Sequence, residues 1–155
     1  MALEWLSALP HATLLRQSDI AYLLVNAAHI GAIGLLFGAI AALDLRLLGA
    51  ARAVPLAAAG PYLARLAAGG LLLALLSGLW LFSVQPGEYL SNRAFLAKLG
   101  LVALGVANAA WLHAGPYWRR TLAGGPVPGG AQLHAALSLG LWAGAIVAGR
   151  WIGFL

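Results

Sequence analysis

The sequence predicts an all-α integral membrane four-helix bundle with a short amino-terminal interfacial helix. Of its 155 residues, 63% are hydrophobic and only 8% are charged, a composition outside the range of soluble globular domains. Four apolar runs each approach the ~20 residues that a helix needs to cross a bilayer. Because little polar sequence is left over, we expect a single membrane domain over residues 1–155 and no separate soluble domain.

The expected elements follow one another with turn-forming residues between them. Residues 1–19 mix Trp and Leu with polar residues, and we expect them to lie along the membrane interface as a short helix broken near Pro10. The spans are expected at about residues 20–43, 66–84, 94–113 and 135–154. The connections AVPLAAAGPY, QPGEYLSN and GPYWRRTLAGGPVPGG carry the Pro and Gly that break helices. Four spans place both termini on one side of the membrane.

The basic residues are scattered along the chain, which carries a formal charge of +5. This scatter is typical of anchors to lipid headgroups and not of a nucleic-acid-binding surface. The absence of Cys excludes disulfides and thiolate metal sites. The connections between spans one and two and between spans three and four hold Arg46, Arg52, Arg65, Arg119 and Arg120, and the opposite side holds Arg16, Arg93, Lys98 and Arg150. This slight imbalance favours termini outside, with inverted insertion as the alternative.

Polar residues at matched depths in the first two spans form a candidate pocket. At about 1.5 Å per residue, His29 and Ser77 lie roughly 4 Å from the midplane, and Asn26 and Trp80 roughly 7 to 8 Å, all toward the termini. Asn26 and His29 also share a helix face. In one interpretation the pocket is structural: His29 bonds Ser77, and Asn26 bonds the Trp80 indole or a backbone carbonyl. In the other, His29 is a haem ligand or handles protons in the bundle core.

His113 and His134 form a second candidate pair, on the far side of the membrane. Both lie about 14 to 15 Å from the midplane, where the third span ends and the fourth begins. Matched histidines on antiparallel helices suit a shared metal or b-type haem, although at that depth water also satisfies them. His29 lies roughly 18 Å away in depth and is not expected to share their iron. A haem on His29 needs His11 folded inward, or else it is five-coordinate.

Charged residues at the span ends are candidates for ion pairs. Asp44 follows the first span, and Arg65, at the start of the second, is its expected partner. Arg150 either reaches the headgroups or pairs with an acid on its own side, Asp19 or Glu4. Either pairing of Arg150 would clamp the amino-terminal segment to the bundle.

Small residues recur at four-residue spacing, in Gly34 with Gly38 and in Gly140 with Gly144. In lipid such spacing lets helix backbones approach closely, although Gly is abundant throughout this chain. Motifs of hydrolases, of phosphate loops and of dinucleotide-binding folds are absent, so those reactions have no support, and enzymatic activity is left undecided. Met1 is the only Met, so a copper(I) site would need an unusual ligand set.

Three stretches together resemble an uncharacterised family of small bacterial four-span inner-membrane proteins, a domain of unknown function. They are AHIGAIGLLFGAIAALDLRLLG, which starts at Ala28, then LSGLWLFS, and the closing LSLGLWAGAIVAGRWIGFL. The resemblance implies a multi-pass protein of the bacterial inner (cytoplasmic) membrane and implies no chemistry. More distantly, the chain is similar to the cytochrome b561 and copper-resistance D type of membrane protein. It departs from the two-haem pattern because it lacks four well-placed intramembrane His residues.

Two functional hypotheses follow from these features. In the first, the bundle holds His29 in a polar pocket, binds haem b and takes part in membrane electron transfer near a quinone pool. In the second, the protein is a non-catalytic membrane subunit or a transport accessory for a metal or small solute, and its histidines are structural. The expected partners are the lipid bilayer and either another membrane subunit or further copies of this chain, and no nucleic acid.

Overall fold

The structure is a computed structural model that describes residues 3–154 and, in this range, contains helices and no strand. Four helices are long and apolar enough to cross a membrane. The predicted all-α four-helix bundle is therefore confirmed, and the chain is a multi-pass membrane protein. The elements in chain order are η1 (Glu4–Ala8), α1 (Pro10–Gln17), α2 (Asp19–Leu47), α3 (Leu56–Phe82), α4 (Pro86–Ser91), α5 (Arg93–Ala114), α6 (Pro116–Leu122), α7 (Gly129–Trp151) and η2 (Ile152–Phe154).

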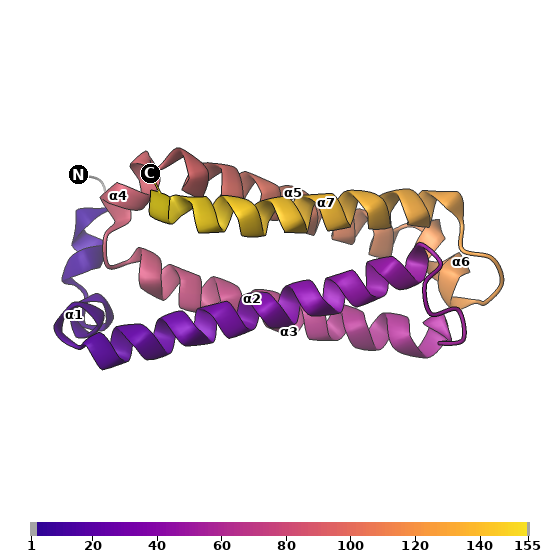
Figure 1. The fold of residues 1–155 in the computed structure, drawn as a ribbon, viewed down its shortest axis with the longest axis horizontal. Coiled ribbons are helices and arrows are strands. Elements are labelled where there is room, and N and C mark those ends of the chain that lie inside the picture. Colours follow the sequence, from indigo (N-terminus) through magenta and orange to yellow (C-terminus); the bar gives the residue numbers. More distant parts are fainter. Residues whose placement is uncertain (1–2, 155) are drawn as a thin grey trace.

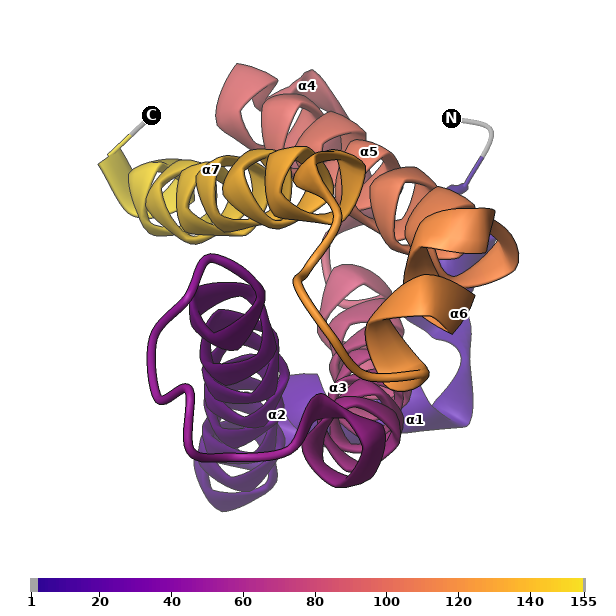
Figure 2. The same ribbon diagram turned by 90° about the vertical axis from the view of Figure 1, so that its right-hand side faces the viewer.

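The long helices form two antiparallel pairs, α2 with α3 and α5 with α7 (Figure 1). Seen end-on, the two pairs stack, and α2 lies next to α7 across the join (Figure 2). Both ends of the chain lie at the end of the bundle that carries α1 and α4, which we call the terminal end (Figure 1). The opposite end, which carries α6, we call the loop end. The two termini therefore lie on one side, as four spans predict.

The second long helix, α3, begins at Leu56 instead of near residue 66. Its first turn follows Pro55, whose extended backbone precedes the helix, and continues through three successive alanines, the best helix formers. Pro61 lies inside this helix, where it removes one backbone hydrogen bond without ending the helix. The prediction of a loop over this stretch is wrong, because it takes both Pro55 and Pro61 as helix breakers.

Two predicted connections contain short helices. α4 and α6 each begin with a proline at the first helical position, where the missing N–H has no helical partner to lose. α4 leads directly into α5 through Asn92, whose side-chain oxygen accepts hydrogen bonds from the backbone N–H groups of Ala94 and Phe95, at 2.9 and 3.2 Å. This is a standard N-cap. The prolines therefore reset the chain direction and keep the connections compact.

The amino-terminal segment crosses the terminal end of the bundle as two short helices, η1 and α1 (Figure 1). They are separated at Leu9, directly before Pro10, as expected. Trp80 of α3 ties this segment to the bundle, because its indole N–H donates to the His11 carbonyl at 2.9 Å. Ser18 then caps α2 by accepting from the backbone N–H of Ala21 at 3.2 Å. The amino-terminal helix is thus anchored to α3 and continuous with α2.

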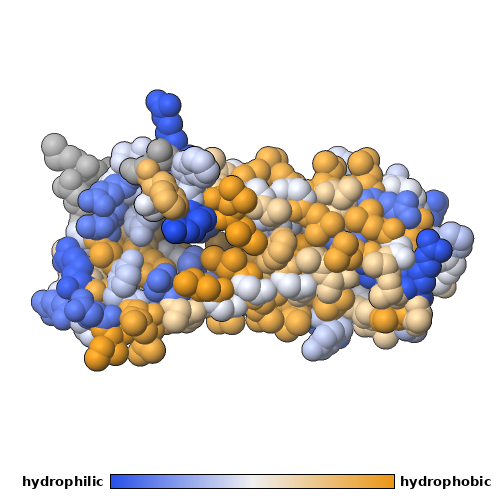
Figure 3. Space-filling model, in the orientation of Figure 1, coloured by the Kyte–Doolittle hydropathy of each residue, from blue (hydrophilic) through white to orange (hydrophobic). Residues whose placement is uncertain are grey.

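The buried apolar core lies at the loop end, where Leu47 is fully buried and Trp118 of α6 packs against the long helices. Elsewhere most large apolar side chains point outward, as on a membrane protein. Hydrophobic side chains cover the middle of the face seen in Figure 3, and hydrophilic ones gather toward its ends. The core residues are Leu43, Leu47, Leu56, Leu112, Trp118, Ala131 and Ala135.

Close helix packing depends on glycines other than those with four-residue spacing. A Cβ at Gly70 of α3 would lie 2.7 Å from the backbone nitrogen of Leu36 in α2. A Cβ at Gly105 of α5 would lie 2.8 Å from the Trp142 ring of α7. By contrast, a Cβ at Gly34, Gly38 or Gly140 would meet nothing within 4 Å, and one at Gly144 would only make ordinary contact with Leu101. The spacing did not identify the contact faces, because Gly is also common on the lipid-facing sides.

Candidate functional site

The centre of the candidate site is a hydrogen bond between α2 and α3. His29 Nδ1 lies 2.9 Å from Ser77 Oγ, as the structural interpretation of the pocket predicts. The Ser77 hydroxyl donates its only proton to the Leu73 carbonyl at 2.6 Å. It can therefore only accept from the imidazole, so Nδ1 carries the proton. The Ala74 carbonyl, 3.4 Å from the same hydroxyl, is a further acceptor for the imidazole N–H.

This tautomer leaves Nε2 as the unprotonated ring nitrogen of His29. Nε2 makes no hydrogen bond with the described part of the chain. The ring lies against Gly78, where an added Cβ would be only 3.0 Å from Cε1. Ser77 fixes the orientation of the imidazole, and the bare backbone at Gly78 makes room for it. The result is an oriented, half-buried imidazole with an available lone pair.

Lys98 of α5 adds a positive charge near this imidazole. It is the sixth residue of α5, roughly 8 Å inside the helix end, and it is half-buried. Its side chain packs beside Gly149 of α7, and it acts electrostatically on His29. None of the acids that the structure describes, Asp19, Asp44 and Glu88, forms an ion pair with it. The charge of Lys98 therefore acts on His29 without a compensating acid among the described side chains.

The prediction that Lys98 is a headgroup anchor misses its electrostatic effect on His29. Its position more than one turn inside an apolar helix was the available signal, since intramembrane charges usually face the bundle interior. That position alone could not say which helix Lys98 faces. The packing of α5 against α7 places the Lys98 side chain beside Gly149, where its charge acts on His29.

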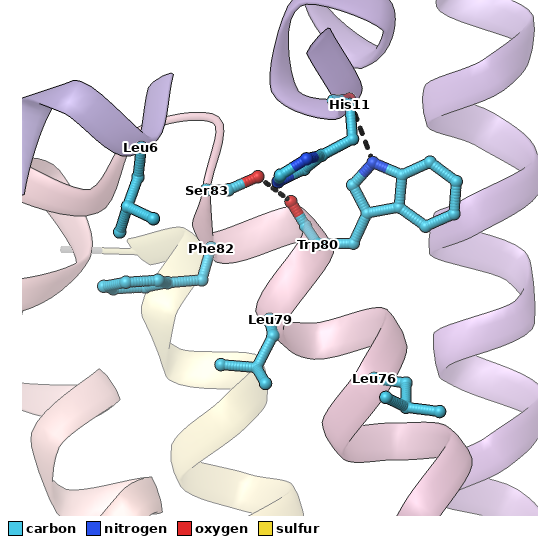
Figure 4. Close-up of a pocket in the computed structure, with 7 residues that line it drawn as sticks. All are labelled: Leu6, His11, Leu76, Leu79, Trp80, Phe82 and Ser83. Atoms are coloured by element: carbon cyan, nitrogen blue, oxygen red, sulfur yellow. Dashed lines mark hydrogen bonds between the residues drawn. The ribbon is translucent and has the colours of Figure 1, made fainter. Parts of the chain in front are cut away.

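The other half of the predicted pocket is not formed as expected, because the Trp80 indole bonds the His11 carbonyl instead of Asn26. Asn26 lies half-buried one turn from His29. Trp80 instead separates two open grooves of about 500 and 470 Å³ that share Trp80 and Leu76. The first is lined by Leu6, His11, Leu76, Leu79, Trp80, Phe82 and Ser83, with the His11 ring extending toward Ser83 (Figure 4). His11 thus folds onto α3, on the far side of Trp80 from the groove that Ser77 lines.

His113 and His134 each have their own hydrogen-bond partner at the loop end. His113 Nδ1 donates to the Ala109 carbonyl at 2.7 Å, and the ring lies 4.2 Å from the Trp118 ring. His134 Nδ1 donates to Asn108 Oδ1 at 2.6 Å, and the Asn108 amide donates back to the His134 carbonyl at 2.9 Å. Within residues 3–154 no hydrogen bond or ring contact joins the two imidazoles. Each imidazole is oriented by its own Nδ1 hydrogen bond, while His113 Nε2 is buried without a partner among the described residues.

The expected ion pairs do not form in the part of the chain that the structure describes. Asp44 faces α7, where Ser138 hydrogen-bonds its carboxyl group, and Arg65 donates to the Pro61 carbonyl at 3.2 Å. The rotation of α2 explains the difference, because its Asp44 side packs against α7 and not against α3. Arg150 lies 4.7 Å from the Phe154 ring centroid, while Asp19 occupies the first turn of α2, where a negative charge suits the helix dipole. The Glu4 side chain lies outside the described part.

Comparisons with protein-family models, with curated proteins and with solved structures find no match to this chain.

Proposed function

We propose that this membrane protein binds a b-type haem through His29 Nε2 and takes part in membrane electron transfer. The observation that supports this most strongly is the hydrogen bond from His29 Nδ1 to Ser77. A histidine that ligates a metal usually donates its other ring N–H to such a partner, which fixes both the tautomer and the ring orientation. The free Nε2 and the room above Gly78 suit the same role. Bound haem would supply one-electron redox chemistry at this position.

Lys98 gives the site a second feature that suits haem. Haem b carries two carboxylate groups, and a carboxylate inside a bundle needs a charged or hydrogen-bonding partner. Lys98 has no acid partner among the described residues and acts on His29 from α5. We therefore assign Lys98 to the carboxylate side of the ligand and His29 to the metal.

Among the described residues, His29 is the one side chain that we assign as a ligand to the iron. His113 and His134 lie far from it at the loop end, where the Nδ1 atom of each has a partner of its own, and Trp80 separates His11 from the groove that Ser77 lines. Because the site lies within the apolar spans, a lipid-soluble carrier of the quinone class is the matching redox partner. A neighbouring membrane subunit or a second copy of the chain would complete the electron path.

An absorption spectrum of the protein purified in detergent from haem-sufficient cells tests the proposal. We expect a reduced-state haem spectrum that is lost in His29→Ala and kept in the matched variants His113→Ala and His134→Ala. A spectrum lost in His113→Ala would move the haem to the loop end. A colourless protein that takes up no added haemin would refute haem binding and favour the alternative, a non-catalytic subunit or transport accessory with structural histidines.

For location, we propose the bacterial inner membrane with the termini outside. Lys98 faces the bundle interior, so the headgroup cations of the terminal end are reduced to Arg16, Arg93 and Arg150. The loop side retains Arg46, Arg52, Arg65, Arg119 and Arg120, and the positive-inside rule then favours a cytoplasmic loop end. Because the chain has no Cys, a single cysteine can be placed at Ser91, at the terminal end, or at Ala123, at the loop end. A thiol reagent that does not cross the membrane then labels only the cysteine that faces the outside of the cell. Labelling of Ala123→Cys from outside the cell would show that the protein has the opposite orientation.

A further inference from the structure

A second polar site lies at the loop end, centred on Asp44 of α2. This residue is only 4% exposed, and Ser138 of α7, the one described side chain that hydrogen-bonds its carboxyl group, is 7% exposed. The second carboxyl oxygen, Oδ2, is buried and has no partner among the described residues. Asp44 is therefore a buried acid held between two helices by a single neutral hydroxyl.

No positive charge compensates this carboxyl group within residues 3–154. Most cations and titratable groups around this end have other partners or are exposed, and half-buried Tyr117 of α6 packs its ring 6.4 Å from that of His134, centroid to centroid. Arg46 donates to the carbonyls of Val54 and Arg52, and Arg65 donates to the carbonyl of Pro61. His134 Nδ1 donates to Asn108, and His113 Nδ1 donates to the Ala109 carbonyl. Tyr62, Arg119 and Arg120 are exposed. None of them forms an ion pair with Asp44.

The face of α7 that meets α2 offers only neutral groups. One turn beyond Ser138, Trp142 is 5% exposed, and its indole N–H is buried without a partner in the described chain. Trp142 is fixed in place by Gly105 of α5, which leaves no space for a Cβ beside the ring. The surroundings of Asp44 therefore combine low polarity with rigid packing, and both raise the free energy of an uncompensated charge.

We propose that Asp44 is a proton-binding site, which carries a proton at neutral pH and joins α2 to α7 as a neutral acid through Ser138. A carboxyl group inside a bundle, with one neutral partner and no cation, avoids the desolvation of its charge by binding a proton. A metal cation would need several ligands, and the described part of the chain has no group of three or more His, Cys, Asp or Glu side chains that could hold one. This site is separate from the proposed haem function, since it lies at the opposite end of the bundle.

Loss of this proton would place an unpaired charge between α2 and α7. Because α2 and α7 make the main contact between the two helix pairs, ionisation of Asp44 is expected to loosen this join. The protonated acid is thus the form that keeps the pairs together. Proton release and separation of the pairs are coupled in this scheme.

The chain contains only two aspartates, Asp19 and Asp44, so its carboxyl groups can be followed one by one. The experiment uses the full chain in detergent, labelled with aspartate carrying ¹³C at the side-chain carboxyl, and records NMR spectra across a pH series. We expect two carboxyl resonances, one from each aspartate, and the one from Asp44 should be that of a protonated acid at neutral pH. The matched variants Asp19→Asn and Asp44→Asn assign them, and Asp19→Asn alone is sufficient if Asp44→Asn does not fold.

A resonance of Asp44 that is ionised at neutral pH would overturn the proposal. If that resonance also shifts when sodium is added, the site binds a cation and not a proton. Ser138→Ala tests the bridge, because it should shift the Asp44 resonance and leave that of Asp19 unchanged. An Asp44 resonance unaffected by Ser138→Ala would refute the role of the hydroxyl.

Discussion

Gly78→Ala should damage the candidate site while leaving the fold intact. The added methyl would lie 3.0 Å from His29 Cε1, well inside the ~3.5–4.0 Å optimum for carbon atoms, so the ring must move away from α3 by about 0.5 Å. The 2.9 Å bond to Ser77 would then lengthen beyond the usual ~3.2 Å limit. Loss of such a bond between membrane helices costs about 0.6 to 2 kcal/mol, while replacing a helical Gly by Ala returns up to about 1 kcal/mol.

The two effects on folding nearly cancel, but the effect on ligand binding does not. Loss of the partner that orients a metal-binding histidine typically lowers affinity about 10- to 100-fold. We therefore expect Gly78→Ala to change the free energy of unfolding by no more than about 1 kcal/mol and to weaken haemin binding. Gly69→Ala is the matched control, because a Cβ there meets nothing within 4 Å.

The assays are unfolding in mixed detergent micelles and titration with haemin. Equal haemin affinity in Gly78→Ala and Gly69→Ala would refute the claim that contact with Gly78 and Ser77 fixes the His29 ring. If neither variant nor the parent chain binds haemin, the haem proposal fails, and the ring geometry can still be tested by NMR of the His29 imidazole.

Three further predictions concern other parts of the molecule. Gly70→Ala should reduce the free energy of unfolding by about 1 to 3 kcal/mol in the same unfolding assay. The added Cβ would meet the Leu36 backbone, which cannot move aside as a side chain can. A free energy of unfolding equal to that of Gly69→Ala would contradict this. Lys98→Met should weaken the binding of haemin but not that of haemin dimethyl ester, which has no free carboxylates. Lys98→Arg, which keeps the positive charge, should bind haemin as the parent chain does. Identical titrations of the parent chain and both variants would argue against an ionic contact. Burial raises the pKa of the Tyr89 hydroxyl, so its ionised form should appear in an ultraviolet pH titration only above the usual range of tyrosine. The contribution of neutral Tyr89 to the free energy of unfolding should be complete below that range and decline above it. Tyr89→Phe should remove this titration step, and an unchanged titration would contradict the assignment.

The sequence predicted the bundle because the bilayer sets strict requirements on it. Apolar runs of about 20 residues can only cross the membrane as helices, since every backbone group must be paired within the segment. The same depth rule brought His29 and Ser77 to one level, and the structure joins them at 2.9 Å. Helix ends were less predictable, because a proline such as Pro61 is tolerated when the residues around it favour helix.

Depth along a helix says nothing about rotation around it, and this is why other pairings were missed. Asp44 and Arg65 were matched by position, yet Asp44 faces Ser138 on α7. Asn26 and Trp80 were matched by level, yet the indole bonds the carbonyl of His11 in a segment that the depth estimate did not include. In a sequence where nearly all faces are apolar, no periodic pattern marks the inward one.

By itself, then, the sequence determined that this chain folds as four membrane-spanning helices with both termini on one side, and that His29 is unusual in being a polar residue near mid-membrane. Tertiary structure alone decided the neighbours: Ser77 and Gly78 around the imidazole, Lys98 turned inward from α5, and Asp44 enclosed against α7. The physical reason is that hydrophobicity specifies immersion in lipid, which every span satisfies equally. Helix rotation and pairing depend on close contacts at particular residues, such as Gly70 on Leu36 and Gly105 on Trp142.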